Sequence, residues 1–523
     1  MNKQAASLTF VFFFLTLILP VHVLANNLDI TNVRLGTREP SSKSLSVLFD
    51  VSWENSWRNK INHDAVWMTV RLHDSRASLV EKRLCQMKAV GINPSGVSTG
   101  SSSLEVEVPS DKTGAYLRKA ANDAVGPVAV QNVMLTVNYE SCGFSDSDQV
   151  TASVLGVEMV FVPEGAFFAG DRGASTAAFR QGSVDSDAWA ISSESAIPVT
   201  GAVSDGYYYT SAGGTDEYPT GTGFSVPAAF PKGHSPFYVM KYEITEGEWV
   251  AFINGIPASA RSAHDLTDTT HKNSDSVIDR NTIACSGNPL VCTTQRPSRP
   301  VSYLGWKDLA AFLDWMALRP MTELEFEKAA RGPFVPVKGA YAWGTTTISP
   351  ASAISVGEED GEEVVEDPGA NANYGAAVFT GGDSVEGPEY SSGPLRGAIF
   401  STDISDREVS GAGNYGSFEM SGNLKEWVVS VGSSDGLVFS GANGDGYLTT
   451  LSGFAGQANV SGWPGMDTDE ARGITGVKGV GFRGGAWDDP SDRLRVSDRA
   501  EAVSPIPSAA SSFGGRGVRT ATK

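Results

Sequence analysis

The stretch Gly411–Trp427, which reads GAGNYGSFEMSGNLKEW, is the segment around which the rest of the chain is organised. It mixes glycines, an amide, carboxylates and aromatic rings too irregularly for a plain helix or strand. Glycines permit positive φ angles, which let the oxygen atoms of a loop converge. Asn423 and Glu426 can turn their oxygens toward one hard cation while Trp427 anchors the loop in the core. An ordinary glycine-rich turn is the alternative interpretation.

The composition describes an acidic, glycine-rich globular chain. Its 523 residues include 57 glycines, and 41% of them are hydrophobic, which is enough for a large core connected by many loops. Lys and Arg number 40 against 60 Asp and Glu, a formal net charge of -20. Nucleic-acid binding needs clustered basic residues that release counterions, so the composition argues against a nucleic-acid partner.

The N-terminus predicts export. Lys3 precedes an apolar run from Leu8 to Leu19, and Val23-Leu24-Ala25 supplies the small or modest residues of a cleavage site, so residues 1–25 are predicted to be a signal peptide. An uncleaved N-terminal anchor is the alternative. No later apolar stretch approaches about 20 residues, so we expect no membrane span after cleavage. The expected location is secreted or extracytoplasmic, in the periplasm or at the cell surface.

The four cysteines of an exported chain predict two disulfides. Cys85 and Cys142 both lie in the N-terminal region, while Cys285 and Cys292 flank a short loop, and we expect these two pairs. A thiolate metal pair at Cys285 and Cys292 is the alternative. No nearby histidine or further cysteine completes such a site, which favours the disulfide.

Residues 27–150 predict a β-sandwich domain. The segments 45–51, 65–72 and 128–139 are rich in branched and aromatic residues with partial alternation, which is typical of strands. Short strands separated by polar turns indicate a sandwich. The tryptophans of this region are expected in the core, with a carbohydrate-stacking platform as the alternative: Trp53, Trp57 and Trp67.

A second domain is expected from residue 155 to residue 523. Thr245 caps a short helix that runs through Asn254, residues 306–317 show helical spacing of apolar residues, and Thr322-Glu-Leu-Glu325 is a capping box that starts a helix to Arg331. Long insertions separate these elements. The tyrosine-rich Gly206–Tyr209 has the composition of binding loops, with surface decoration as the alternative.

The C-terminal region is rich in arginine. Guanidinium groups can fork into carboxylates or main-chain carbonyls, so we expect these side chains to brace a region built from loops, and binding of an anionic ligand is the alternative. The residues concerned are Arg483, Arg495, Arg499, Arg516 and Arg519.

From about residue 155 onward, a series of blocks resembles the formylglycine-generating enzyme (sulfatase-modifying factor) family, in the same order. The blocks are VEMVFVPEGAFFAGD, FYVMKYEITEGEWVAFIN, RPVSYLGWKDLAAFLDWMALRPMTELEFEKAARG, YAWG, GNYGSFEMSGNLKEW, GFRGGAWDD and GGRGVRTA. The resemblance implies an α+β fold similar to an elaborated C-type lectin, with long loop insertions and structural calcium. Asn423, Glu426 and Asn373 match positions whose oxygens bind calcium in that family.

The catalytic part of the family pattern is missing. The resemblance implies a pair of copper(I)-binding cysteines shortly after the R-G-G block, because copper(I) requires soft thiolates. This chain has the hard donors Asp488 and Asp489 there, and no cysteine after Cys292. Copper is therefore not expected. Relatives that oxidise sulfur with iron take their iron-binding histidines largely from a separate helical domain, whereas the N-terminal half of this chain is expected to be β, so the resemblance does not favour that activity. The pocket beside the block is expected to involve Trp343, Arg483, Trp487, Asp488 and Asp489.

The function expected from these observations is that of a secreted, calcium-stabilised, non-catalytic binding module for a glycan or protein ligand. The alternative is a formylglycine-generating oxidase, acting on protein cysteine, with a diverged site. A structural role in assembly on the cell envelope, through the N-terminal strands, is a third hypothesis.

Overall fold

The computed structural model describes residues 28–77, 80–100, 102–182, 187–354, 363–379, 392–402 and 405–522. The predicted signal peptide lies outside this range. The described chain is mostly β-structure with few helices, which confirms the α+β class. Its α-helices are α1 (Glu246–Ile253), α2 (Ala258–Arg261), α3 (Trp306–Trp315), α4 (Glu323–Arg331) and α5 (Ser434–Leu437), and short 3-10 helices cover Pro40–Ser42, Tyr139–Cys142, Ser262–His264, Glu470–Arg472 and Ser491–Leu494.

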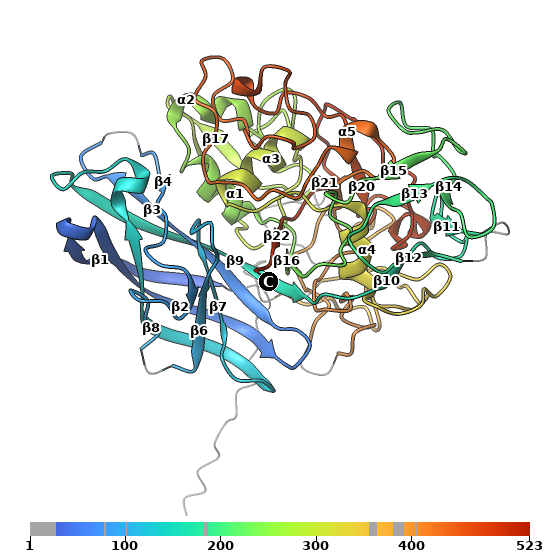
Figure 1. Ribbon diagram of the computed structural model, residues 1–523, viewed down its shortest axis with the longest axis horizontal. Helices are drawn as coiled ribbons and strands as arrows, with labels where there is room; N and C mark the ends of the chain where they lie inside the picture. The colour runs from blue at the N-terminus through green and yellow to red at the C-terminus, as the bar shows by residue number, and fades with distance from the viewer. Residues whose placement is uncertain are drawn as a thin grey trace, which may run out of the picture.

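The N-terminal strands form two sheets that share one apolar cluster. The first sheet has the order β1-β2-β8 and the second contains β9, β3, β7, β6 and β5, and Figure 1 shows them together on one side of the molecule. Trp53 and Trp67 are buried, as expected. The strands are β1 (Asp29–Glu39), β2 (Ser44–Arg58), β3 (Asp64–Asp74), β4 (Arg83–Leu84), β5 (Gly91–Ile92), β6 (Leu104–Val108), β7 (Ala115–Lys119), β8 (Ala124–Asn138) and β9 (Val150–Val162).

One sheet joins the N-terminal strands to the rest of the chain. Its order is β22-β16-β9-β3-β7-β6-β5. Strand β9 pairs with β3 from Asp74↔Val150 to Asp64↔Val160, and its last residues pair with β16 (Phe237–Met240) on the opposite edge. The expected boundary between residues 150 and 155 therefore lies inside β9, which both regions share.

Short strands complete the C-terminal region. A four-stranded sheet has the order β11-β14-β13-β15, and a three-stranded sheet has the order β20-β19-β21. The bounds are β10 (Phe167–Ala169), β11 (Phe179–Gln181), β12 (Trp189–Ile191), β13 (Ile197–Val199), β14 (Tyr207–Tyr209), β15 (Phe224–Val226), β17 (Ala284–Ser286), β18 (Val291–Thr293), β19 (Lys425–Val429), β20 (Val480–Arg483), β21 (Phe513–Gly514) and β22 (Val518–Thr520).

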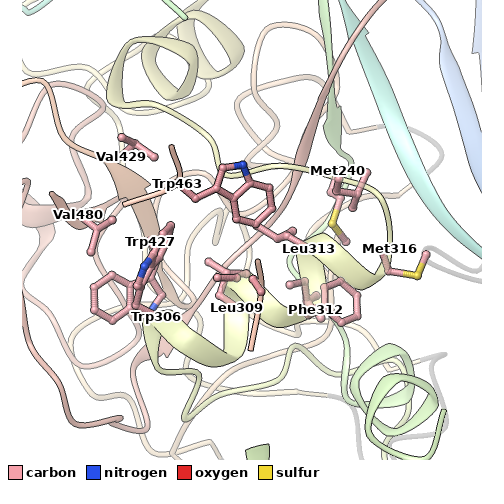
Figure 2. Packing of buried hydrophobic residues seen from close by; sticks show 14 of the residues in the cluster. Met240, Trp306, Leu309, Phe312, Leu313, Met316, Trp427, Val429, Trp463 and Val480 are labelled. Carbon is pink, nitrogen blue, oxygen red and sulfur yellow. The ribbon is translucent and has the colours of Figure 1, made fainter. Parts of the chain in front are cut away.

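The core of the C-terminal region forms around α3. Figure 2 shows Leu309, Phe312 and Leu313 of this helix lying near Trp427 of β19 and Trp463. These side chains are buried in one cluster, so α3 fixes the position of β19.

The capping predictions are confirmed. Thr245 and Glu248 form a capping box at the start of α1, and Thr322 and Glu325 form another at the start of α4. Gly332 ends α4 with φ 76°, a conformation that favours glycine.

The disulfide predictions are also confirmed. Cys85 is joined to Cys142, and Cys285 to Cys292 across the β17–β18 hairpin. Within the described residues, no helix is long and apolar enough to cross a membrane.

The tyrosine-rich insertion differs from expectation. Tyr207–Tyr209 forms β14 in the middle of a sheet, and Tyr208 and Tyr209 are only 6% and 3% exposed. The guanidinium of Arg499 lies 4.4 Å from the ring centroid of Tyr209. Both rings are buried, so neither offers a face to a ligand, and the guanidinium of Arg499 covers Tyr209.

Candidate functional site

The stretch 411–427 is a glycine-rich loop that leads into β19. Strand β19 pairs with β20 on one side and with β21 on the other, and Trp427 donates from Nε1 to the main-chain oxygen of Leu304 at 2.9 Å. The indole is completely buried, which confirms its predicted role as the anchor of the loop. The polar residues of the stretch are thereby held at the centre of the C-terminal region.

The structure brings Asn373 and Asn423 together. Asn373 Nδ2 donates to Asn423 Oδ1 at 3.0 Å, and the main-chain N–H of Leu395 donates to the same oxygen at 2.8 Å. Asn423 Nδ2 donates to Glu243 Oε2 at 2.6 Å and to the main-chain oxygen of Leu395 at 3.0 Å. The amide of Asn423 thus makes four hydrogen bonds, whereas the buried Oδ1 of Asn373 has no partner.

Glu426 is paired with an arginine. Arg516 donates from Nε to Glu426 Oε2 at 2.8 Å and from Nη2 to Oε1 at 2.7 Å. Burial raises the pKa of Glu426, and Arg516 partly offsets this effect. Burial also raises the pKa of Glu243 well above its usual range, and it raises the pKa of Glu419 to about 7. Glu426, Glu243 and Glu419 therefore all lie close enough to Arg516 for its positive charge to lower their pKa values.

The three predicted calcium residues do not present a common ligand shell. Calcium takes six to eight oxygens, but both oxygens of Glu426 are bound by Arg516 and the oxygen of Asn423 already accepts two hydrogen bonds. Of the three side chains, only that of Asn373 offers an oxygen without a partner. In this arrangement the set does not fit calcium.

The segment after the R-G-G block meets β19 through Lys425. Its Nζ lies 3.1 Å from Asp489 Oδ2 and 2.8 Å from Glu501 Oε2. Burial alone would lower the pKa of Lys425, but the two carboxylates outweigh it and raise the pKa. A cation held in this way is a poor nucleophile and a poor base, because it keeps its proton.

Trp487 and Asp488 immediately precede Asp489, the partner of Lys425. Partial burial and the adjacent Asp489 raise the pKa of Asp488. Trp487 is buried, and its Nε1 donates to the main-chain oxygen of Ser511 at 3.1 Å. The structure thus brings together Trp487, Asp488 and Asp489, and adds Lys425, which the sequence analysis did not single out.

The other two predicted pocket residues lie in the interior. Arg483 is 2% exposed and binds Glu323 and Glu327 at 3.0 and 2.7 Å. Trp343 is 3% exposed, stacks on Tyr341 and donates from Nε1 to the main-chain oxygen of Thr347. Both side chains are held by internal partners instead of lining an open pocket.

The cysteines stand apart from this segment. Cys285 and Cys292 lie in the β17–β18 hairpin, where Asn254 at the end of α1 bonds the main chain of Cys292. Figure 1 shows β17 beside α1, away from β20 and β21. All four cysteines of the chain are in disulfides.

A cavity of about 260 Å³ opens where the N-terminal strands meet the stretch 411–427. We call it the junction pocket. Three of its lining residues are aromatic, and Tyr242 and Phe418 stack with their centroids 5.7 Å apart. The lining residues are Asn55, Trp57, Lys241, Tyr242, Ala398, Ser401, Gly416 and Phe418.

Lys241, one of the residues that line the junction pocket, belongs to a buried ion cluster. Lys241 Nζ lies 2.9 Å from Glu158 Oε2, 4.0 Å from Asp64 Oδ2 and 5.4 Å from the ring centroid of Trp57. Burial raises the pKa of Asp64 to about 6, and Lys241 limits that rise. The second oxygen of Glu158 is buried without a hydrogen-bond partner. Asp64 belongs to β3 and Glu158 to β9, so the cluster joins the two regions.

The family relationship follows from residues 148–521, which match the model of the sulfatase-modifying factor enzyme 1-like domain. The chain belongs to this family. No curated protein matches the chain. The match begins just before β9 and reaches β22, so the sulfatase-modifying factor domain includes the strand that it shares with the N-terminal sheet.

Sequence reasoning predicted part of this site. The bracing role expected for the C-terminal arginines is present at Arg483, Arg499 and Arg516, each of which binds a buried carboxylate. It did not identify Glu243 or Lys241 as neighbours of the stretch 411–427. Both lie in the block FYVMKYEITEGEWVAFIN. In this block charged residues alternate with apolar ones on a strand that is expected to be buried, and this pattern could have indicated that the charged side chains have buried partners.

Proposed function

We propose that this protein is a secreted, non-catalytic binding member of the sulfatase-modifying factor family and that the junction pocket holds a glycan. Residues 27–150, as a β-sandwich, supply one wall through Trp57. Residues 155–523, with an elaborated C-type lectin fold, supply Tyr242 and Phe418. The proposal rests on one observation, which is that aromatic side chains from both regions line the same cavity.

The chemistry of the pocket suits a sugar ring. The C–H faces of a sugar pack against aromatic faces, and a few polar groups at the rim then fix its orientation. Asn55 and Ser401 supply such groups beside the aromatic rings. Gly416 allows the fit, because a Cβ at this position would lie 2.7 Å from the indole of Trp57.

The arrangement after the R-G-G block supports a non-catalytic role. Copper(I) oxidation of a substrate cysteine requires a thiolate pair, and the corresponding segment carries Asp488 and Asp489. Asp489 is paired with Lys425, and the Cys285–Cys292 disulfide lies in a hairpin next to α1.

A panel of immobilised, defined oligosaccharides tests the proposal, followed by calorimetry on any binder. Trp57→Ala and Phe418→Ala are expected to weaken binding about tenfold each, since one stacked ring contributes up to about 1.5 kcal/mol. Phe334→Ala is the control, because Phe334 is an exposed aromatic residue that does not line the pocket. Absence of glycan binding, or equal binding by all variants, would refute the proposal.

The oxidase alternative has a separate test. Thiol titration of the native protein is expected to find no free thiol, and incubation with copper and a cysteine-containing peptide is expected to give no aldehyde. Copper-dependent aldehyde formation that is lost in Cys285→Ser would place the oxidase function first.

A further inference from the structure

Oxygen atoms surround the guanidinium group of Arg516 as they would surround a bound cation. Besides its two bonds to Glu426, Nη2 donates to the main-chain oxygen of Phe418 at 2.6 Å. Nη1 donates to the main-chain oxygens of Met240 and Lys241 at 3.0 and 3.3 Å. A guanidinium has five N–H donors, and these five bonds use them all.

Two further carboxyl groups lie in the field of the same guanidinium. Glu243 accepts bonds from Asn423 Nδ2 at 2.6 Å and from the main-chain N–H of Leu424 at 2.9 Å. Glu419 accepts a bond from the main-chain N–H of Ala398 at 2.6 Å, and its second oxygen is buried without a partner. Both side chains are attracted to Arg516.

We infer that Arg516 is the built-in cation of this site and that the protein takes no calcium at Asn423 and Glu426. Carboxylate and carbonyl oxygens are the ligands that calcium prefers, and here such oxygens bind a guanidinium. A divalent ion at Glu426 would lie close to a completely buried positive charge. The repulsion between two cations is strong in an interior of low dielectric constant.

The covalent attachment of this cation has a consequence for the fold. Arg516 lies between β21 and β22, and it ties the C-terminal strands to Glu426 of β19 and to the end of β16. A calcium ion can dissociate when the metal is scarce, whereas a side chain cannot. The loop 411–427 therefore keeps its conformation whatever the calcium concentration outside the cell.

The first experiment uses the full-length mature protein. Its calcium content after purification in metal-free buffer is compared with that of Glu426→Gln, and thermal unfolding is recorded in CaCl₂ and in EDTA. The inference predicts no calcium that depends on Glu426 and the same melting temperature of the wild type in both solutions. Bound calcium that Glu426→Gln loses, with a fall in the melting temperature of the wild type in EDTA, would overturn it.

The second experiment removes the built-in cation. Arg516→Ala leaves the oxygens of Glu243, Glu419 and Glu426 without it, so CaCl₂ is expected to raise the melting temperature of this variant but not that of the wild type. Arg319→Ala is the matched control. Arg319 is a buried arginine that binds the single carboxylate of Glu325 at 2.9 and 2.6 Å, and its removal creates no set of converging carboxylates.

The outcomes of the second experiment are also decisive. A calcium response in Arg516→Ala alone supports the inference, while no response, or an equal response in Arg319→Ala, contradicts it. If Arg516→Ala does not fold, the comparison of the wild type with Glu426→Gln decides by itself.

Discussion

Two buried clusters of arginine and glutamate lie in the C-terminal region, and their charge balance is opposite. At α4, the carboxylates of Glu323 and Glu327 are paired with three guanidinium groups, which belong to Arg331, Arg483 and Arg499. We call this the arginine-rich cluster. At β19, the carboxyl groups of Glu243, Glu419 and Glu426 share Arg516, and we call this the acid-rich cluster.

The difference appears in the pKa values of the carboxyl groups. In the arginine-rich cluster burial raises the pKa values of Glu323 and Glu327, but the guanidinium groups outweigh burial and the net shift is downward. In the acid-rich cluster burial prevails and the pKa values of all three glutamates rise. Buried glutamates thus have pKa shifts of opposite direction in the two clusters, because the number of neighbouring cations differs.

The largest effect is expected from removing a cation from the arginine-rich cluster. Arg483→Met leaves Glu323 and Glu327 buried without one of their partners, and we expect a loss of about 3–5 kcal/mol in the free energy of unfolding. Urea unfolding measures this loss. Arg483→Lys keeps the positive charge but cannot bind two carboxylates as the guanidinium does. Its free energy of unfolding should therefore lie between those of Arg483→Met and the wild type. A stability within about 1 kcal/mol of the wild type would show that the cluster is not a stabilising element.

The next effect compares one carboxyl group from each cluster. Glu327→Gln removes the negative charge that pairs with Arg331 and Arg483. We expect the free energy of unfolding to fall by about 3 kcal/mol at pH 7. Glu419→Gln removes a carboxyl group whose ionisation burial opposes, so at that pH it should not lower stability and is expected to raise it by up to about 3 kcal/mol. Urea unfolding of the two variants under identical conditions tests the contrast. Equal losses would remove the distinction between the clusters.

The pH dependence of stability sharpens the comparison. The pKa of Glu419 rises from 4.5 to about 7 on folding, so the folded state holds its proton more tightly and stability falls as pH rises between these values. The fall attributable to Glu419 is about 3 kcal/mol. Glu323 and Glu327 act in the opposite sense, because their lowered pKa values give stability above the unfolded pKa that is lost as pH falls.

Glu419→Gln provides the measurement for this prediction. Unfolding curves at pH 5, 6, 7 and 8 should have a flatter pH dependence in Glu419→Gln than in the wild type. An identical slope in the two proteins would mean that Glu419 is not the group that titrates in this range.

The smallest effect is expected at a partly exposed ion pair. Lys425 and Glu501 lie 2.8 Å apart, but the side chain of Glu501 is 38% exposed and Asp489 remains as a second partner of Lys425. Solvent screening limits such a pair, so Glu501→Gln should cost less than about 1 kcal/mol. A loss of stability comparable with that of Arg483→Met would show that burial does not determine how much an ion pair contributes to the free energy of unfolding.

Local signals in the sequence predicted the local structure. Thr322 and Glu325 are three residues apart, and a capping box needs nothing else, so α4 was found with its boundaries. The positions of the four cysteines along the chain likewise predicted both disulfides. The buried position of Trp427 followed from its size and its apolar character.

The errors arose where distant segments meet. Tyr208 and Tyr209 have the composition of a binding loop, but Arg499, nearly 300 residues away along the chain, covers Tyr209. The sequence predicted that Arg516 braces the region, but it did not identify Glu426 as the partner of Arg516. Single-sequence reasoning cannot tell a metal from a guanidinium as the partner of a buried carboxylate, since both supply positive charge.

The sequence by itself determined the family of this protein, the helices α1, α3 and α4, and the disulfides, because each depends on residues close together in the chain or on a fixed order of blocks. Only the tertiary structure decided that the two regions share one sheet through β9 and that Arg516 meets Glu426. Those contacts join residues far apart in the chain, and the balance of charge at a buried carboxylate depends on every cation that folding brings within a few ångströms.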